Sequence, residues 1–279
     1  MAIFTDVGLN TESLMLSNLR IAPVQLSMYG HPVSTASDEM DYFIVGRFSE
    51  TSRVKDYYTE APLMISGTGM NSVKPNIKRP TFIEKQEFIN KKTINVYITA
   101  SLPKINPVIR RCWETILDKT RYEIVYHLLP GNAAMQELSV LRRDLEYYLG
   151  SGKIIVYKDL NYADYMNVIK HCDLGMGSYH YGDYNRIIDS LWMGTPVVVV
   201  KGNCGYQNTG AGALKAVGLN ELIADDLDEY INITLNLIDQ RKLRTNLQRK
   251  VLELDITKKL INNSDYIEDF NRTIKSLFL

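Results

Sequence analysis

The sequence predicts an α/β protein whose main part is a doubly wound parallel sheet, and three observations carry that prediction. From about residue 92 onward, short apolar runs alternate regularly with segments of helical periodicity. The run 197–200 consists of four valines, the pattern of a parallel strand covered on both faces. The helix before it ends at Gly194, a residue typical of helix C-termini, and Pro196 lies just beyond.

The first 50 residues are typical of the tail of an α/β unit. We expect a helix at 10–18, strands at 21–28 and 41–45, and a loop at 29–37 that is rich in Gly, Pro and hydroxyl groups. No opening β-α-β run is expected, so the chain is predicted to begin in the middle of a sheet. Residues 50–85 show little periodicity and are interpreted as a domain linker with short strands.

The regular part of the chain follows this linker. Its predicted strands lie at 93–100, 122–129, 154–157, 174–176, 197–200 and 222–224. Its predicted helices lie at 107–119, 135–149, 162–170, 184–194, 211–217, 227–240 and 241–252. Asn106 caps the first of these helices, and Gly150 closes the second.

Composition excludes several classes of function. The 279 residues contain 32 Lys plus Arg and 32 Asp plus Glu, so the formal net charge is zero and no nucleic-acid footprint is expected. Three scattered cysteines offer neither a disulfide framework nor a metal knuckle, which favours a reduced, cytoplasmic setting. The N-terminus does not resemble a secretory signal, and no apolar run approaches the roughly 18 residues of a membrane span.

Ligands of a doubly wound sheet bind at the carboxyl ends of its strands. The loops at those ends are predicted at 101–106, 130–132, 158–162, 177–185 and 202–210. The stretch from Gly177 to Val200 combines a polar loop, a short helix and a buried strand, and a helix that begins after a strand and loop presents N–H groups to anions.

Three side chains near these loops are candidates for binding a ligand. Lys104 precedes a helix cap and could meet a phosphate, with a solvated lysine as the alternative. Asp189 lies in an apolar context and needs a partner, which two ribose hydroxyls or a structural donor would supply. Asn185 lies four residues earlier, on the same helix face.

The histidines differ in the roles that their sequence contexts suggest. His31, in a loop beside Gly and Pro, is a candidate general base or phosphate donor, with a structural or solvated role as the alternative. His127 ends an apolar strand and is interpreted as a core histidine. His171 and His180 are not spaced with carboxylates or cysteines as metal ligands, so no metal site is predicted. Tyr179, Tyr181 and Tyr184 could stack on a base or sugar, or simply pack at the sheet edge.

Four segments resemble, in order, the bacterial cytoplasmic N-glucosyltransferases that modify high-molecular-weight adhesins, which belong to glycosyltransferase family forty-one with the O-GlcNAc transferases. The segments run from Gly30-His31-Pro32 to Val45, over Lys104-Ile105-Asn106-Pro107, from Cys172-Asp173 to Asp189, and from Leu214 to Tyr230. In the third, Gly182-Asp183-Tyr184-Asn185-Arg186-Ile187-Ile188-Asp189 matches the family's Gly-Asn-Thr-Asn-Gly-Ile-Ile-Asp.

The resemblance implies a GT-B-like fold, with two Rossmann-like domains facing each other across a cleft. A partial N-terminal Rossmann-like domain and linker would occupy 1–85. A complete C-terminal Rossmann-like domain at 86–255 would bind a UDP-sugar, and a C-terminal helix at 256–279 would pack back on the first domain. The family's upstream helical domain and the first half of its N-terminal Rossmann domain have no counterpart in the match, and a proposed catalytic base of the family lies there.

The resemblance also implies residue roles, with His31 and Lys104 as the catalytic pair. Lys104 would contact the diphosphate and Asp189 the ribose, while His31 would face the sugar or acceptor. The remaining donor contacts would come from Ser101, Asn132, Gly182, Asn185 and Arg186. Leu160 and Asp159 occupy the positions where the family has His-Ser, so contacts from these positions to the nucleotide base are in doubt. No metal and no cofactor is implied, because lysine and helix dipoles stabilise the leaving UDP.

The leading hypothesis is therefore a cytoplasmic hexosyltransferase that moves a sugar, with glucose first in line, from a UDP-sugar to a protein side chain. Asparagine in Asn-x-Ser/Thr is the expected acceptor. One alternative is a truncated, non-catalytic relative that binds nucleotide or a partner glycosyltransferase chain. A weaker alternative is a GT-B transferase that acts on a glycan or small molecule.

Overall fold

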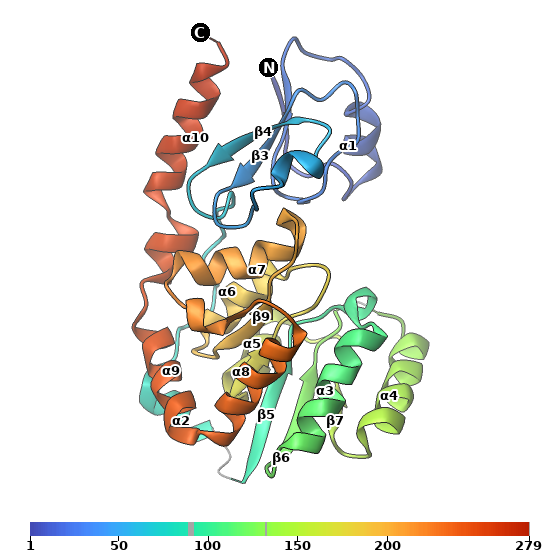
Figure 1. Ribbon diagram of the computed structural model, residues 1–279, viewed down its shortest axis with the longest axis vertical. Coiled ribbons are helices and arrows are strands. Elements are labelled where there is room, and N and C mark those ends of the chain that lie inside the picture. The colour runs from blue at the N-terminus through green and yellow to red at the C-terminus, as the bar shows by residue number, and fades with distance from the viewer. Residues whose placement is uncertain (89–91, 132, 279) are drawn as a thin grey trace. The chain divides into compact units, whose positions relative to one another are not determined.

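Two compact units, each with its own parallel sheet, make up the computed structural model, which describes residues 1–88, 92–131 and 133–278 (Figure 1). Unit 1 comprises Met1–Val73, Gly202–Gly218 and Thr257–Leu279. Unit 2 comprises Lys74–Lys201 and Leu219–Ile256. The α/β class predicted from the sequence is confirmed in both units.

The sheet of unit 2 has six parallel strands. They are β5 (Thr93–Ile98), β6 (Glu123–Leu128), β7 (Ile154–Val156), β8 (Leu174–Met176), β9 (Val197–Val200) and β10 (Ile223–Ala224). Their order is β10-β9-β8-β5-β6-β7, so the winding direction reverses between β5 and β8, which pair directly. This is the strand order of a dinucleotide-binding sheet, in which the point of reversal is the place for a ligand.

Apart from α2 (Phe82–Phe88), which was not predicted, the helices of unit 2 lie within two residues of the predicted ones at each end. They are α3 (Pro107–Lys119), α4 (Met135–Leu149), α5 (Tyr162–His171), α6 (Tyr184–Trp192), α8 (Leu227–Asp239) and α9 (Arg241–Glu253). Two short turns of 3₁₀-helix are η2 (Leu102–Lys104) and η3 (Asn220–Leu222). The Asn106 side chain accepts hydrogen bonds from the N–H groups of Val108 and Ile109, which explains the start of α3.

Unit 1 has four parallel strands in the order β1-β2-β3-β4. They are β1 (Ala2–Phe4), β2 (Gln25–Ser27), β3 (Tyr42–Gly46) and β4 (Ala61–Ile65). The remaining elements are α1 (Thr11–Leu16), η1 (Val54–Asp56), α7 (Gly205–Ala216), the π-helical turn η4 (Thr257–Ile261) and α10 (Ser264–Ser276).

Three expectations for the N-terminal region are wrong. The chain opens with a β-α-β unit, because β1 pairs in parallel with β2 across α1. The strand expected at 21–28 is only three residues long, since the N–H groups of Ile21 and Ala22 bond the Gln25 side chain and not a neighbouring strand. The segment 50–85 contains a short strand, β4, as expected, but it is not a linker, because β4 pairs with β3 in the sheet of unit 1 and α2 begins at Phe82.

The units also divide the chain differently from the expected domains. The first break falls after Val73 and not near residue 85. Segment 202–218, expected in the second domain, groups with unit 1, and its helix begins six residues earlier than the predicted 211. Glycines permit this approach, because an added Cβ would lie 1.9 Å from Glu50 Oε1 at Gly205 and 2.3 Å from Ser49 Oγ at Gly212.

Helix α10 belongs to the core of unit 1. Tyr266 packs with Leu26, Ile44 and Ile65 of the sheet. Asp269 accepts hydrogen bonds from the N–H and the hydroxyl of Ser66, both at 2.7 Å. These contacts tie the last helix to β4. Over the described ranges of the chain, no helix combines the length and the apolar character that a membrane span requires.

Candidate functional site

The loops after β5 and β8 meet because these two strands lie side by side at the reversal point of unit 2. The loop after β5 carries Lys104 at the end of η2. Its ammonium Nζ donates to the carbonyl of Gly182 at 2.9 Å and forms an ion pair with Asp183. It also lies 4.9 Å from the centre of the Tyr181 ring. Lys104 is thus held against the loop that precedes α6.

Asp183 is the centre of a polar cluster that sequence reasoning did not single out. Its side chain is 3% exposed. One carboxylate oxygen receives Lys104, and the other accepts from Thr99 Oγ1 at 2.8 Å and from both the hydroxyl and the N–H of Ser178. The hydroxyl of Ser178 in turn lies 2.5 Å from the carbonyl of Tyr181. One buried carboxylate therefore orders the whole turn between β8 and α6.

Helix α6 supplies the second cation of the site. Arg186, in its first turn, donates from Nη1 to the carbonyl of Leu129 at 2.7 Å, at the end of β6. A small pocket lies beside this contact. Its lining residues are Leu129, Gly131, Tyr157, Lys158, Asp159, Leu160, Tyr165 and Arg186. The pocket therefore sits at the carboxyl ends of β6 and β7, next to the start of a helix, where anions and planar groups are readily bound.

Asp189 is half-buried one turn further along α6, and it has a protein partner. The hydroxyl of Tyr162 donates to Asp189 Oδ1 at 2.7 Å, and the Tyr162 ring stacks on Tyr165 with centroids 5.9 Å apart. Burial raises the pKa of the Asp189 carboxyl, while hydrogen bonds from Tyr162 and Tyr165 and the charge of Arg186 oppose the rise. The expected need of this acid for a partner is confirmed, and Tyr162 meets it in this structure.

The other predicted donor residues are placed as follows. Gly182 contacts Lys104 through its carbonyl, and Ser101 precedes η2 without a side-chain cap bond. Asn185 is exposed at the start of α6, four residues before Asp189. Asn132 lies outside the described residues. Asp159 and Leu160, whose contacts to the nucleotide base were in doubt, line the small pocket.

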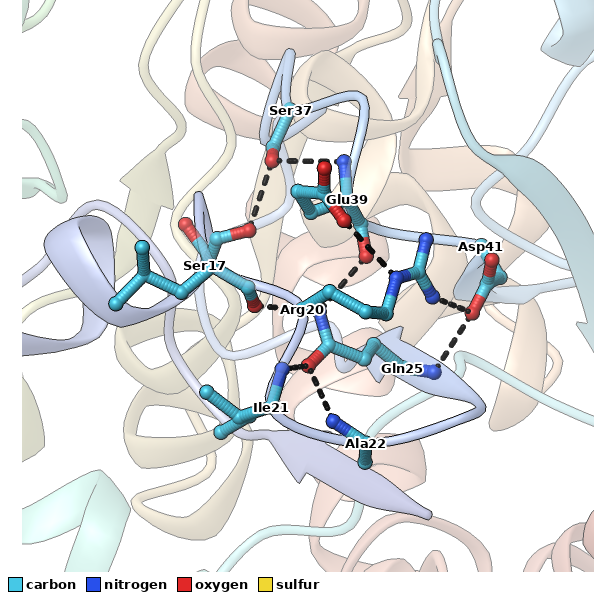
Figure 2. A network of polar contacts seen from close by, with 9 residues as sticks. Ser17, Arg20, Ile21, Ala22, Gln25, Ser37, Glu39 and Asp41 are labelled. Carbon is cyan, nitrogen blue, oxygen red and sulfur yellow. Dashed lines mark hydrogen bonds and ion pairs between the residues drawn. The ribbon is translucent and has the colours of Figure 1, made fainter.

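His31 belongs to unit 1, in the long connection between β2 and β3. It is half-buried, and burial lowers the pKa of its imidazole. The later part of this connection is tied to the sheet by a polar network (Figure 2). Arg20 bridges Glu39 at 2.9 Å and Asp41 at 2.8 Å, and Ser37 Oγ donates to the carbonyl of Ser17 at 2.7 Å.

The middle of the same connection is held by Glu60, which is 3% exposed. Its carboxylate accepts from Ser34 Oγ at 2.8 Å, from the Thr35 N–H at 2.7 Å and from the Thr35 hydroxyl. The donors are neutral, so the contact is structural in character. His31 is therefore carried by a loop that is pinned at several points of unit 1.

His127 is structural, as expected for a histidine on an apolar strand. Its ring nitrogens lie 2.8 Å from Tyr157 Oη and 2.9 Å from Asn95 Oδ1, and burial lowers its pKa to about 4. Within the described part of the chain, no three His, Cys, Asp or Glu side chains are grouped so as to hold a metal ion.

Sequence reasoning missed Asp183 and Tyr162. Asp183 could have been singled out from the sequence, because it aligns with an asparagine of the family motif quoted above. For Tyr162 there was no such signal, since its contact with Asp189 joins α5 to α6 across 27 positions of the sequence.

The two parallel α/β units have the GT-B fold of glycosyltransferases, as comparison with solved structures shows. An O-GlcNAc transferase mutant from Thermobaculum terrenum superposes with a TM-score of 0.81 at 20% identity, over 100% of this chain and 52% of that one. Residues 83–270 match the family described as Glycosyl transferase family 41. The chain belongs to that family.

Curated relatives agree with this assignment. The UDP-glucose:protein N-beta-glucosyltransferase of Actinobacillus pleuropneumoniae serotype 7 is 26% identical over 89% of this chain and 40% of its own length. The probable UDP-N-acetylglucosamine–peptide N-acetylglucosaminyltransferase SPINDLY of Petunia hybrida is 23% identical over 93% of this chain and 28% of its own. The chain thus spans two fifths or less of the length of these two relatives.

Proposed function

We propose that this protein binds a UDP-sugar in unit 2 and takes part in transfer of its hexose to a protein side chain. Glucose and asparagine are the preferred sugar and acceptor, since the more similar of the two relatives above is named for UDP-glucose and N-linked transfer. The observation that carries the proposal is the placement of Lys104 and Arg186 around the start of α6, at the reversal point of a six-stranded parallel sheet.

Each part of a UDP moiety has a matching group. The small pocket beside Arg186 accepts the planar base. Asp189 offers a carboxylate to the ribose hydroxyls, in place of its bond from Tyr162. The first N–H groups of α6 and the two cations face the diphosphate, where developing charge on the leaving UDP would be stabilised. His31 is proposed to act on the sugar or acceptor.

Thermal unfolding with UDP tests the donor site. Millimolar UDP should raise the melting temperature of the wild type by about 3 °C, because a ligand that binds only the native state stabilises it. Lys104→Ala and Asp189→Ala should each remove most of that rise. Lys119→Ala, at the far end of α3, should retain it. No rise for the wild type at millimolar UDP would contradict the proposal.

Transfer itself is tested by mass spectrometry of a co-expressed protein that contains Asn-x-Ser/Thr. A hexose increment on asparagine supports a complete transferase. Nucleotide binding without any increment supports the alternative, a relative that binds the donor and needs a further polypeptide for turnover.

A further inference from the structure

We propose that Asp183 weakens the hold of this site on the donor's diphosphate by keeping Lys104 in a neutral ion pair, and so sets donor affinity. The inference deepens the proposed function and rests on it. It starts from the contacts between the loops after β5 and β8, where Lys104 meets both the Asp183 carboxylate and the Gly182 carbonyl.

Asp183 cannot simply turn away when a phosphate arrives. Its second oxygen is engaged by Thr99 and by the hydroxyl and N–H of Ser178, and the side chain is buried. Moving it would leave the Thr99 hydroxyl and the Ser178 N–H without this acceptor, which is costly in a buried site. The carboxylate therefore stays in place, and a diphosphate bound at Lys104 lies close to a fixed negative charge.

This arrangement changes the share that each part of the donor contributes to binding. Lys104 and Asp183 together present no net charge, so the Coulomb gain expected between a lone ammonium and a phosphate is largely cancelled. The base and ribose contacts around Asp189 and the small pocket do not depend on this pair. Arg186 and the first N–H groups of α6 still attract the diphosphate, so UDP should bind more tightly than uridine, but by less than two free cations would give. The product UDP should then leave readily.

Calorimetric titration of the full chain with UDP and with uridine tests the proposal. Asp183→Asn removes the charge and keeps the size of the side chain, so it should bind UDP about tenfold more tightly than the wild type. Its affinity for uridine should stay unchanged. Asp183→Ser, which leaves a hydroxyl for Ser178, should shift UDP affinity in the same direction and serves if the asparagine variant does not fold.

A matched control is Glu221→Gln, which breaks another lysine–carboxylate pair, that of Lys250 and Glu221 at 2.5 Å. Glu221 precedes β10, at the edge of the sheet where strands begin, so both affinities should equal those of the wild type. Folded Asp183 variants that bind UDP no more tightly than the wild type would overturn this proposal alone. Failure of every protein to bind UDP or uridine would overturn the proposed function as well.

Discussion

One loop in each unit follows a parallel strand and is organised by a buried carboxylate, yet the two carboxylates have different partners. In unit 1, Glu60 accepts hydrogen bonds from hydroxyls and a backbone N–H of the loop after β2. In unit 2, Asp183 also accepts hydrogen bonds from hydroxyls and a backbone N–H, and it forms an ion pair with the Lys104 ammonium. A buried acid thus orders a strand-end loop in both units, and in unit 2 it also holds a cation, at the loop for which we propose donor binding.

Both loops also hold one residue other than glycine in the left-handed region of backbone space. These are Ala36, with φ of 53°, and His180, with φ of 76°. Such backbone persists only where surrounding contacts determine it. Hydrogen bonds close to them in the chain are those of Thr35 to Glu60 and of Ser178 to Asp183.

Removing the acid from the loop of unit 1 should have a large effect on stability. Glu60→Ala leaves the N–H and the hydroxyl of half-buried Thr35 without their acceptor and removes the bond from Ser34, so the free energy of unfolding should fall by about 3 kcal/mol. Glu60→Gln should lose about half as much. UDP affinity, measured on the folded fraction, should not change in either variant. A loss of UDP affinity equal to that of Lys104→Ala would end the distinction between the two loops.

A further effect is expected from pH. Burial lowers the pKa of His127, in the sheet of unit 2, to about 4, below its usual value of 6.5. The native state then binds fewer protons than the unfolded state between these values, so stability present above about pH 6.5 is lost as pH falls towards 4. His127→Gln should flatten this slope in chemical unfolding, and His31→Gln, in the less buried loop of unit 1, should flatten it less. Equal slopes for all three proteins would contradict the assignment.

The helices of unit 2 could be predicted from the sequence more closely than those of unit 1, for physical reasons. The predicted helices at 107–119 and 135–149 coincide with α3 and α4, because a capping asparagine and a terminal glycine mark their ends locally. The start of α7 could not be predicted from the sequence. Its glycine-rich first turns have low helix propensity, and they are helical where close packing on Ser49 and Glu50 requires glycine.

Prediction of the candidate site from the sequence is limited in the same way. Lys104 and Asp189 were named from their local context and from the family motif, and both lie at the carboxyl edge of the unit 2 sheet. Their partners were not predicted, because Lys104 meets Asp183 only through the pairing of β5 with β8, two strands that are 76 or more residues apart in the sequence. Long-range pairing of this kind leaves no periodic signal in a single sequence.

We propose that the loops at the reversal point of unit 2, and not the loop of unit 1, bind the nucleotide. Hydrogen exchange of the full chain with and without saturating UDP tests this proposal. We predict slower exchange in segments 99–104 and 178–186, with segment 30–41 unchanged. Protection confined to 30–41, or no protection of either unit 2 segment, would contradict it.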